Sequence, residues 1–245
     1  MNGAPTPGST NPDIRPGDKP DELLLFDHGF VRLDACMASD LSVVNSARVS
    51  FAVRKEQMDE RDEGLIKFLM RERHGTPFEH NSFRFHIRTP IFVAREWFRH
   101  RISSFNEESA RYHKLEGDFY IPSPTAVRTQ VGKPGSYSYE PMDAVVAGEA
   151  IDTFKRIYEL LYNEYLSLIE SGVAKELARA ILPFGVYTQF YWTVNARSLM
   201  NFLSLRNADA AQYEIRTYAE AVERLFATKM PKTHRCFVDF GRSGP

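Results

Sequence analysis

One short stretch of the chain gathers charged side chains that could bind an anion. Residues 99–112 read RHRISSFNEESARY, which begins with three cations in a row and carries a further arginine, Arg111. Arginine binds phosphate and carboxylate groups through paired hydrogen bonds, and the stretch contains no lysine. The stretch therefore predicts a local anion site. The alternative is a helix end whose arginines pair with the two neighbouring glutamates.

A second stretch, HGTPFEH, could place imidazole and carboxylate groups around a ligand. His74 and His80 flank it, and their spacing, with Pro77 between them, matches no standard zinc motif. No cysteine or aspartate in the stretch supports a metal site, so we expect no metal. The open interpretations are a turn into the following strand, or donors and imidazoles that line a planar ligand.

A third stretch, VNARSLMNFLSLRNA at residues 194–208, has the pattern of an apolar helix with a few polar positions. Asn195 is a candidate N-cap, and Arg197 and Asn201 are one helical turn apart. Arg206 lies at the helix end, where the helix dipole favours a cation. The dipole explanation for Arg206 therefore competes with a role in a site.

Signatures of several enzyme classes are absent from the sequence. It has no G-x-S-x-G elbow, no P-loop and no G-x-G-x-x-G dinucleotide fingerprint. Ser109 has histidines nearby in the sequence, but closeness in sequence does not establish a nucleophile–base pair. A flavin or nicotinamide would therefore not be held in the Rossmann manner.

Composition limits the partners of the chain. Its 245 residues are 43% hydrophobic and 26% charged, as in globular proteins, and the net charge of −1 gives no general attraction to nucleic acid or anionic lipid. No apolar run approaches the roughly 20 residues of a membrane span. Two cysteines, Cys36 and Cys236, are too few for a disulfide framework. We expect no nucleic-acid or membrane partner, a cytoplasmic location, and a buried, inert Cys36.

Hydrophobic periodicity predicts the elements that position these stretches. Strict alternation in NSFRFHIRT predicts a half-buried strand, after which Thr89 caps and Pro90 begins the helix that carries the RHR triplet. The predicted strands span 30–39, 81–89 and 186–196. The predicted helices span 40–51 with Asp40 as N-cap, 59–75 ending at Gly75, 90–101, 142–171 ending before Gly172, 175–183, and two within 196–230, whereas 119–143 is expected to be a long loop.

These elements predict an α+β fold. We expect a single domain with a small mixed or antiparallel sheet and several helices, some of them long. The expected division is a disordered tail at 1–20, the domain at 21–238 and a C-terminal tail at 239–245.

At this point the sequence resembles the flavin-dependent thymidylate synthases. The signature is R-H-R, seven residues and a serine, here Arg99 to Ser109, and the resemblance covers about 23–230. Six motifs occur in the order of that family: ARVSF (47–51), TPFEH (76–80), PIFVAREWFRHR (90–101), DFYIPSP (118–124), ESGVAKELARAILP (170–183) and WTVNARSLMNFLSLR (192–206). One such motif would be weak evidence, whereas six in order are highly specific.

The resemblance implies a homotetramer whose active sites are shared between chains. It implies FAD, with NADPH as reductant and methylenetetrahydrofolate as carbon donor, for the conversion of deoxyuridine monophosphate (dUMP) to thymidine monophosphate. The flavin contacts carried over are His74, Thr76, Arg99, His100, Arg101, Glu107, Asn195, Arg197 and Asn201. The nucleotide contacts carried over are Glu96, Arg99, Glu107, Glu108, Ser109, Ala110, Arg111, Arg179 and Arg206.

The chemistry narrows the roles of a few of these side chains. Neither cysteine follows a proline, so the Pro-Cys motif of the thiol-dependent synthases is absent and the flavin must supply the reducing power. We expect Arg206 to stabilise the uracil as N3 loses its proton, and Ser109 to position the nucleotide. Glu96 stands where the family often has glutamine, and an ionised carboxylate can only accept hydrogen bonds.

Two rival functions are weighed against this one. A non-catalytic nucleotide- or RNA-binding module would present a basic face, which the net charge of −1 disfavours. A different flavoprotein that modifies another pyrimidine nucleotide is separated poorly by sequence alone.

Overall fold

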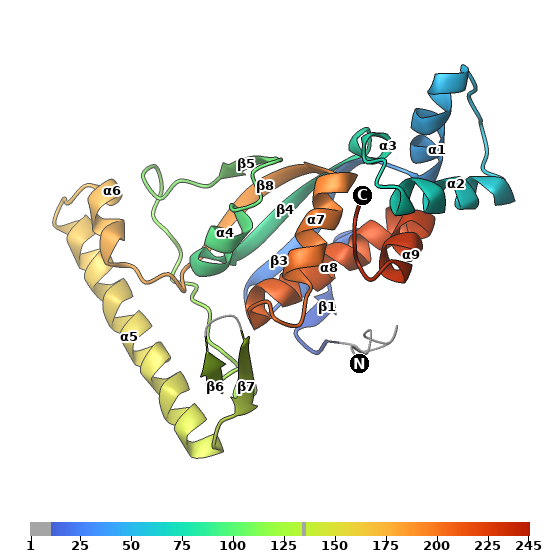
Figure 1. Cartoon of the computed structure of the whole chain (residues 1–245). Helices are drawn as coiled ribbons and strands as arrows, with labels where there is room; N and C mark the ends of the chain where they lie inside the picture. Colours follow the sequence, from blue (N-terminus) through green and yellow to red (C-terminus); the bar gives the residue numbers. More distant parts are fainter. Residues whose placement is uncertain (1–10, 134–135) are drawn as a thin grey trace.

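The computed structural model describes residues 11–133 and 136–245, and one antiparallel sheet organises them (Figure 1). The strands of this sheet lie in the order β1-β2-β3-β4-β8-β5, and every neighbouring pair is antiparallel. Their bounds are β1 Ile14–Pro16, β2 Glu22–Leu25, β3 Gly29–Met37, β4 Ser82–Pro90, β5 Ser104–Glu107 and β8 Tyr187–Asn195. The expected α+β class with an antiparallel sheet is therefore confirmed.

Helices α4, α7 and α8 lie against the sheet, α1 to α3 lie at one end of it, and an arm extends from it (Figure 1). The helices are α1 Asp40–Arg48, α2 Glu60–Arg71, α3 Thr76–Glu79, α4 Ile91–Trp97, α5 Ala144–Glu170, α6 Lys175–Ala178, α7 Ala196–Arg206, α8 Tyr213–Lys229 and α9 Pro231–Asp239, with 3-10 turns at Val49–Phe51 and Arg179–Ile181. The long α5 runs beside a two-stranded hairpin of β6 Arg128–Lys133 and β7 Ser136–Pro141. No helix in the described part of the chain is both long and apolar enough to cross a membrane.

The core forms where α7 and α8 cover one face of the sheet (Figure 1). Alternation along β4 buries Phe83, Phe85 and Ile87 and turns Arg84 towards solvent, as the sequence predicted. Phe85 pairs in register with Trp192 of β8, whose ring stacks on it with centroids 5.5 Å apart. Aromatic packing of this kind fixes the register between the two strands that lead into α4 and α7.

Several expected element ends are wrong for local reasons. The cap of α1 is Ser39, whose hydroxyl accepts from the Ser42 N–H, and Asp40 is instead the first helical residue. Thr89 belongs to β4 and Pro90 is the N-cap of α4, so the strand runs directly into the helix. Helix α2 ends at Arg71, and Gly75 is the N-cap of the short α3 rather than the end of α2.

Other expectations fail because the signal in the sequence was weak. The loop expected at 119–143 contains the hairpin of β6 and β7, and the end of the chain contains a third helix, α9. The prediction of a disordered tail at 1–20 is wrong for Ile14–Pro16, because this segment forms β1 and joins the sheet. Residues 1–10 of the predicted tail lie outside the described residues. Cys36 is exposed rather than buried, while Cys236 is buried.

Candidate functional site

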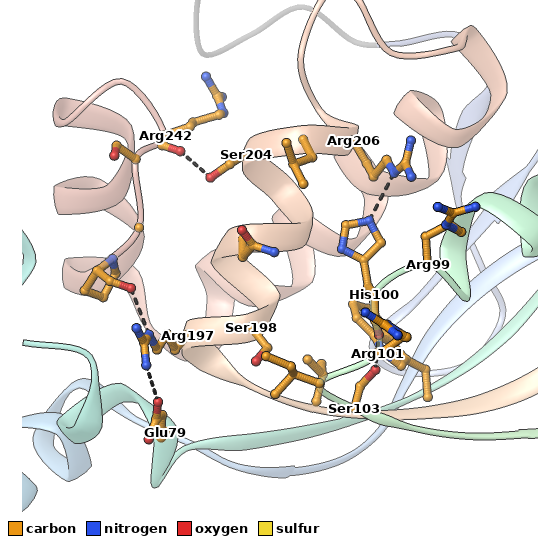
Figure 2. A pocket seen from close by; sticks show the side chains of 18 of the residues that line it. Glu79, Arg99, His100, Arg101, Ser103, Arg197, Ser198, Ser204, Arg206 and Arg242 are labelled. Atoms are coloured by element: carbon orange, nitrogen blue, oxygen red, sulfur yellow. Dashed lines mark hydrogen bonds and ion pairs between the residues drawn. The ribbon is translucent and has the colours of Figure 1, made fainter. Parts of the chain in front are cut away.

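A cavity of about 1130 Å³ opens beside α7, where the segment after α4 and the last residues of the chain meet (Figure 2). It collects arginines, two carboxylates and an apolar wall from parts of the chain more than 100 residues apart. Its lining includes Glu79, Glu96, Arg99, His100, Arg101, Ser103, Trp192, Val194, Arg197, Ser198, Asn201, Ser204, Leu205, Arg206 and Arg242.

Packing around Trp97 holds the RHR triplet against this cavity. Trp97 ends α4, is fully buried and stacks on Phe202 of α7 with ring centroids 4.8 Å apart. The His100 ring meets the same Phe202 edge-on at 4.9 Å. The apolar helix of the sequence motif thus places Arg99 and Arg101 at the rim, where both are exposed.

Arg206 is the most constrained cation of the cavity. It donates from Nη1 to Glu96 Oε2 at 2.9 Å, from Nη2 to the Glu96 carbonyl at 3.2 Å, and from Nε to His100 Nε2 at 3.0 Å. Burial, with Arg206 nearby, lowers the pKa of His100 to about 4, so the ring is neutral at pH 7 and accepts the hydrogen bond. Burial raises the pKa of Glu96 despite the opposing charge of Arg206.

Arg197 and Asn195 serve different purposes, although both belong to one motif. The Asn195 side chain accepts from the Ser198 N–H at 2.9 Å and caps α7, so the predicted cap is confirmed. Arg197 donates to Glu79 Oε1 at 2.6 Å. A Cβ on Gly75 would come within 2.5 Å of Arg197 Nε, so glycine lets this guanidinium pack on the backbone.

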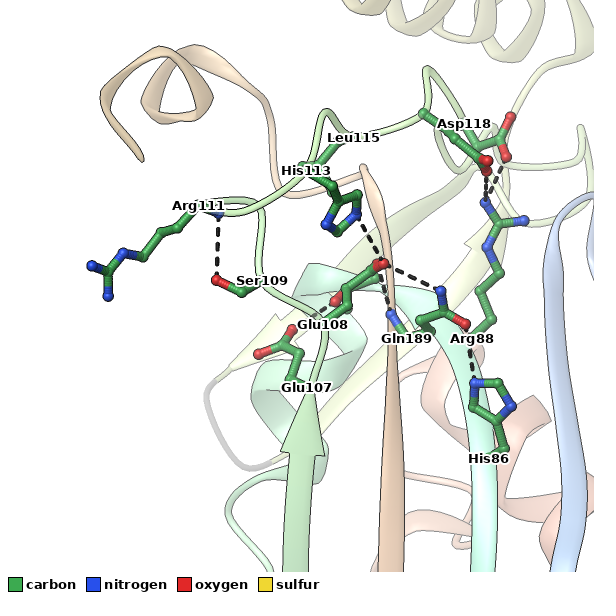
Figure 3. A network of polar contacts seen from close by, with 12 residues as sticks. His86, Arg88, Glu107, Glu108, Ser109, Arg111, His113, Leu115, Asp118 and Gln189 are labelled. Atoms are coloured by element: carbon green, nitrogen blue, oxygen red, sulfur yellow. Dashed lines mark hydrogen bonds and ion pairs between the residues drawn. The ribbon is translucent and has the colours of Figure 1, made fainter. Parts of the chain in front are cut away.

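The carboxylates after β5 lie at a second, smaller cavity of about 220 Å³. Glu107 accepts from the Thr188 hydroxyl at 2.7 Å, and Glu108 accepts from the Gln189 N–H and side-chain amide at 3.0 and 3.2 Å (Figure 3). These bonds attach the end of β5 to β8. The same cavity is lined by Ala110, Arg179 and Arg95.

Four further candidate residues line neither of these two cavities: Ser109, Arg111, His74 and Thr76. The Ser109 hydroxyl accepts from the Arg111 N–H at 3.4 Å, and the Arg111 side chain pairs with Glu176 at 3.4 Å. His74 packs edge-on against Phe68, and Thr76 begins α3. The structure thus gathers one part of the predicted set around Arg206, places His74 and Thr76 on either side of Gly75 next to Arg197, and leaves Ser109 and Arg111 outside both cavities.

Sequence reasoning missed several residues that line the cavities. Glu79 lies inside the TPFEH motif and Ser198 inside the α7 motif, so both were within reach of motif reasoning. Arg95 precedes Glu96 on α4. Arg242 lies beyond every motif, and nothing in its sequence context indicates that it approaches α7.

Comparisons with known proteins show which family and which structures the chain is similar to. The family described as Thy1, thymidylate synthase complementing protein, matches residues 32–232. A flavin-dependent thymidylate synthase of Thermotoga neapolitana is 44% identical over 223 residues, which cover 91% of this chain and 97% of the relative. One of Thermosipho africanus is 46% identical over 223 residues, covering 91% and 96%.

A solved structure shares the fold. A UMP/dUMP methylase, PolB, of Streptomyces cacaoi, bound with 5-Br dUMP, superposes with a TM-score of 0.83 at 44% identity. The match covers 90% of this chain and 99% of that one.

Proposed function

The chain belongs to the family of flavin-dependent thymidylate synthases, and on this premise we propose which side chains serve each ligand. The activity is reductive methylation of dUMP to thymidine monophosphate. It uses FAD, NADPH and methylenetetrahydrofolate. When bound, FAD supplies the reducing equivalents that a methylation without a cysteine nucleophile requires.

The chemistry of the larger cavity supports its assignment to the flavin. Arginines line the cavity from several elements, and Val194, Leu205 and Trp192 supply apolar wall, a combination that suits a ring system joined to phosphates. The Trp192 indole N–H is buried and has no partner among the described residues, as expected beside a site that a ligand completes. The residues assigned to FAD here are His100, Arg101, Arg197 and Asn201, with His74, Thr76 and Asn195 supporting the turn and helix end.

The observation that carries the proposal is the pairing of Arg206. Its guanidinium faces a half-buried carboxylate, Glu96, and a neutral imidazole, His100, so it is held in place at the cavity by one ion pair and one neutral acceptor. A uracil that loses its N3 proton would present an anion to this guanidinium. Stabilising that anion makes C5 more nucleophilic towards the one-carbon unit.

The nucleotide is proposed to extend from Arg206 and Arg99 towards the loop after β5. Ser109 and Arg111 would bind phosphate and sugar there, with Arg179 nearby. Glu107 and Glu108, whose carboxylates already bind β8, would hold the loop in shape, with Ala110 beside them. The main proposed role of Glu96 is to hold Arg206 in position, and a direct contact with the base is secondary.

Within one chain, some of the proposed nucleotide ligands lie outside the larger cavity. This supports a site that is shared between chains of a homotetramer. Arg111 and Arg179 are not among the residues that line the larger cavity, so a second chain would have to bring equivalent groups to it. Helix α5 offers an interface, because Val145, Val146, Phe154 and Leu160 are all large, apolar and exposed on it.

The proposed function is tested by colour and by isotope release. The purified protein should show a flavin absorption band that NADPH bleaches, and tritium should leave C5 of labelled dUMP in the presence of methylenetetrahydrofolate. A colourless protein would contradict the flavin assignment of the cavity. A flavoprotein that releases no tritium would contradict dUMP as substrate, and a monomer in sedimentation would contradict the shared site.

Uridine monophosphate is a second candidate substrate. The support is the Streptomyces cacaoi structure, described as a UMP/dUMP methylase and solved also with 5-Br UMP at 44% identity. Turnover of the two nucleotides in competition measures the preference directly. If the kcat/KM values for dUMP and UMP differ by less than about tenfold, the chain has both activities. Enzymes that select for or against one hydroxyl group often discriminate by a larger factor.

A further inference from the structure

The last residues of the chain cross α7 and line the flavin cavity. After α9 the chain reverses at Gly241 and Arg242, which have φ of +64° and +56°, and their N–H groups bond back to Val238 and Phe237 at 2.9 Å each. The Arg242 carbonyl then accepts from the Ser204 hydroxyl of α7 (Figure 2). We use the term strap for residues 242–245.

The near end of the strap is fixed by a buried ion pair. Arg242 Nε donates to both oxygens of Glu223 at 3.2 Å, and Glu223 is only 5% exposed. Burial alone would raise the pKa of Glu223, but His234, Arg242 and Asn207 outweigh it, and the pKa is lowered. The carboxylate is therefore ionised at pH 7 and anchors the strap.

The far end of the strap reaches a proposed flavin ligand. The Pro245 carbonyl accepts from Arg197 Nε at 3.0 Å, while Glu79 accepts from Nη1 of the same guanidinium. Gly244 lies close to α7: a Cβ there would stand 3.1 Å from Met200 Cβ. Arg197 thus gives Nε to Pro245 and Nη1 to Glu79, so an anionic ligand that binds this guanidinium side-on through Nε and Nη2 must displace the Pro245 oxygen.

We infer that residues 243–245 compete with the flavin for Arg197 and swing away from it when the cofactor binds. This inference rests on the proposed function of the cavity. The Pro245 oxygen is the acceptor that leaves, because only packing and a single backbone bond, from the Ser243 N–H to the Phe240 carbonyl at 3.2 Å, hold the rest of the segment beyond Arg242. The Arg242–Glu223 pair stays in place and acts as the hinge. Flavin affinity is reduced in proportion to the share of molecules with the strap closed.

Deletion of residues 243–245 tests the competition, since it removes the far end and keeps the Arg242–Glu223 pair. Flavin-loaded protein is diluted and the fluorescence of released FAD gives the dissociation constant. The shortened chain should bind FAD about tenfold more tightly, the equivalent of one hydrogen bond to a charged group. Equal or weaker binding by the shortened chain overturns the inference.

A second pair of variants separates the strap from a general loss of charge. Arg242→Ala frees the anchor and should also tighten FAD binding, whereas Arg224→Ala removes a surface arginine that pairs with Glu220 and should leave affinity unchanged. Unchanged affinity in Arg242→Ala, once thermal melting shows that it is folded, counts against the strap. If neither full-length nor shortened protein binds FAD, the cofactor role of the cavity fails, and the competition fails with it.

Discussion

The ion cluster around Asp62 and the one around Arg206 use the same side-chain types for different ends. Asp62 is fully buried and accepts from Arg48 Nη2 at 2.8 Å, Lys55 Nζ at 2.5 Å and the Asp59 N–H at 2.9 Å. Burial would raise the pKa of Asp62, but these donors outweigh it and lower the pKa to about 2. This cluster joins α1 to the start of α2 with its charges matched.

The cavity cluster is unmatched. Arg206 is compensated by one carboxylate whose own pKa is raised, and no carboxylate within the described residues forms an ion pair with Arg99 or Arg101. A folded chain gains little stability from cations left in this state. The difference separates a cluster that serves folding from one that we propose binds an anionic ligand, and the following variants test that distinction.

Arg206→Ala should have the largest effect, a loss of about 10²- to 10³-fold in turnover, because it removes a preorganised donor to a developing anion. Tritium release from C5-labelled dUMP measures it. The substitution also leaves Glu96 without its partner, so the double variant Arg206→Ala/Glu96→Gln serves as control and should be equally inactive. Retained turnover with unchanged nucleotide affinity would remove Arg206 from the catalytic machinery.

Asp62→Asn should mainly affect folding, lowering the free energy of unfolding by about 2 kcal/mol. This is below the ~3–5 kcal/mol for a fully buried pair, because Arg48 and Lys55 partly reach water. Turnover per folded molecule should stay the same. Denaturant unfolding measures the change, with the exposed Glu56→Gln as a matched control expected within about 0.5 kcal/mol.

The effect of Asp62 should also depend on pH. Its folded pKa of about 2 lies below the ordinary value of 3.8, so its contribution is complete above about pH 4 and is lost as pH falls towards 2. The stability difference between wild type and Asp62→Asn should therefore shrink over that interval. A difference that stays constant down to pH 2 would mean that the carboxylate charge is not the source of the stability.

The two clusters also differ in how far sequence alone could anticipate them. Alternation in β4 and the apolar spacing of α4 and α7 predicted the elements that carry Glu96 and Arg206, because burial on one face imposes a period. Their pairing depends on the packing of α4 against α7 across 110 residues, which no local pattern encodes. The resemblance of the motifs identified Glu96 and Arg206 as candidates, and the structure shows that their side chains form an ion pair.

The hairpin of β6 and β7 was missed because it has no buried face. Nearly every side chain of β6 and β7 is exposed, so the hairpin leaves no alternation in the sequence. Residues 242–245 likewise rest on one ion pair to Glu223 of α8 and on backbone contacts to α7. Such contacts depend on tertiary structure and not on the composition of the segment.

Glu96→Gln should give a smaller effect that depends on pH. An ionised Glu96 competes with the uracil anion for Arg206, so nucleotide affinity in the wild type should rise as pH falls through the raised pKa of Glu96. The variant should keep the higher affinity throughout, with a gain of about tenfold at neutral pH that vanishes in acid. Calorimetric titration of dUMP measures both, with Glu220→Gln as surface control. Parallel curves for variant and wild type would contradict the competition.

Replacement of the two thiols should have the smallest effect. Cys36 and Cys236 line neither cavity, and burial raises the pKa of Cys236, which disfavours the thiolate that a nucleophile needs. The double variant Cys36→Ser/Cys236→Ser should therefore turn over dUMP within about twofold of wild type at equal concentrations of folded protein, since no step requires a thiol. Loss of all activity in a folded variant would show that a cysteine enters the chemistry. Catalysis could then no longer be attributed to the arginines of the cavity alone.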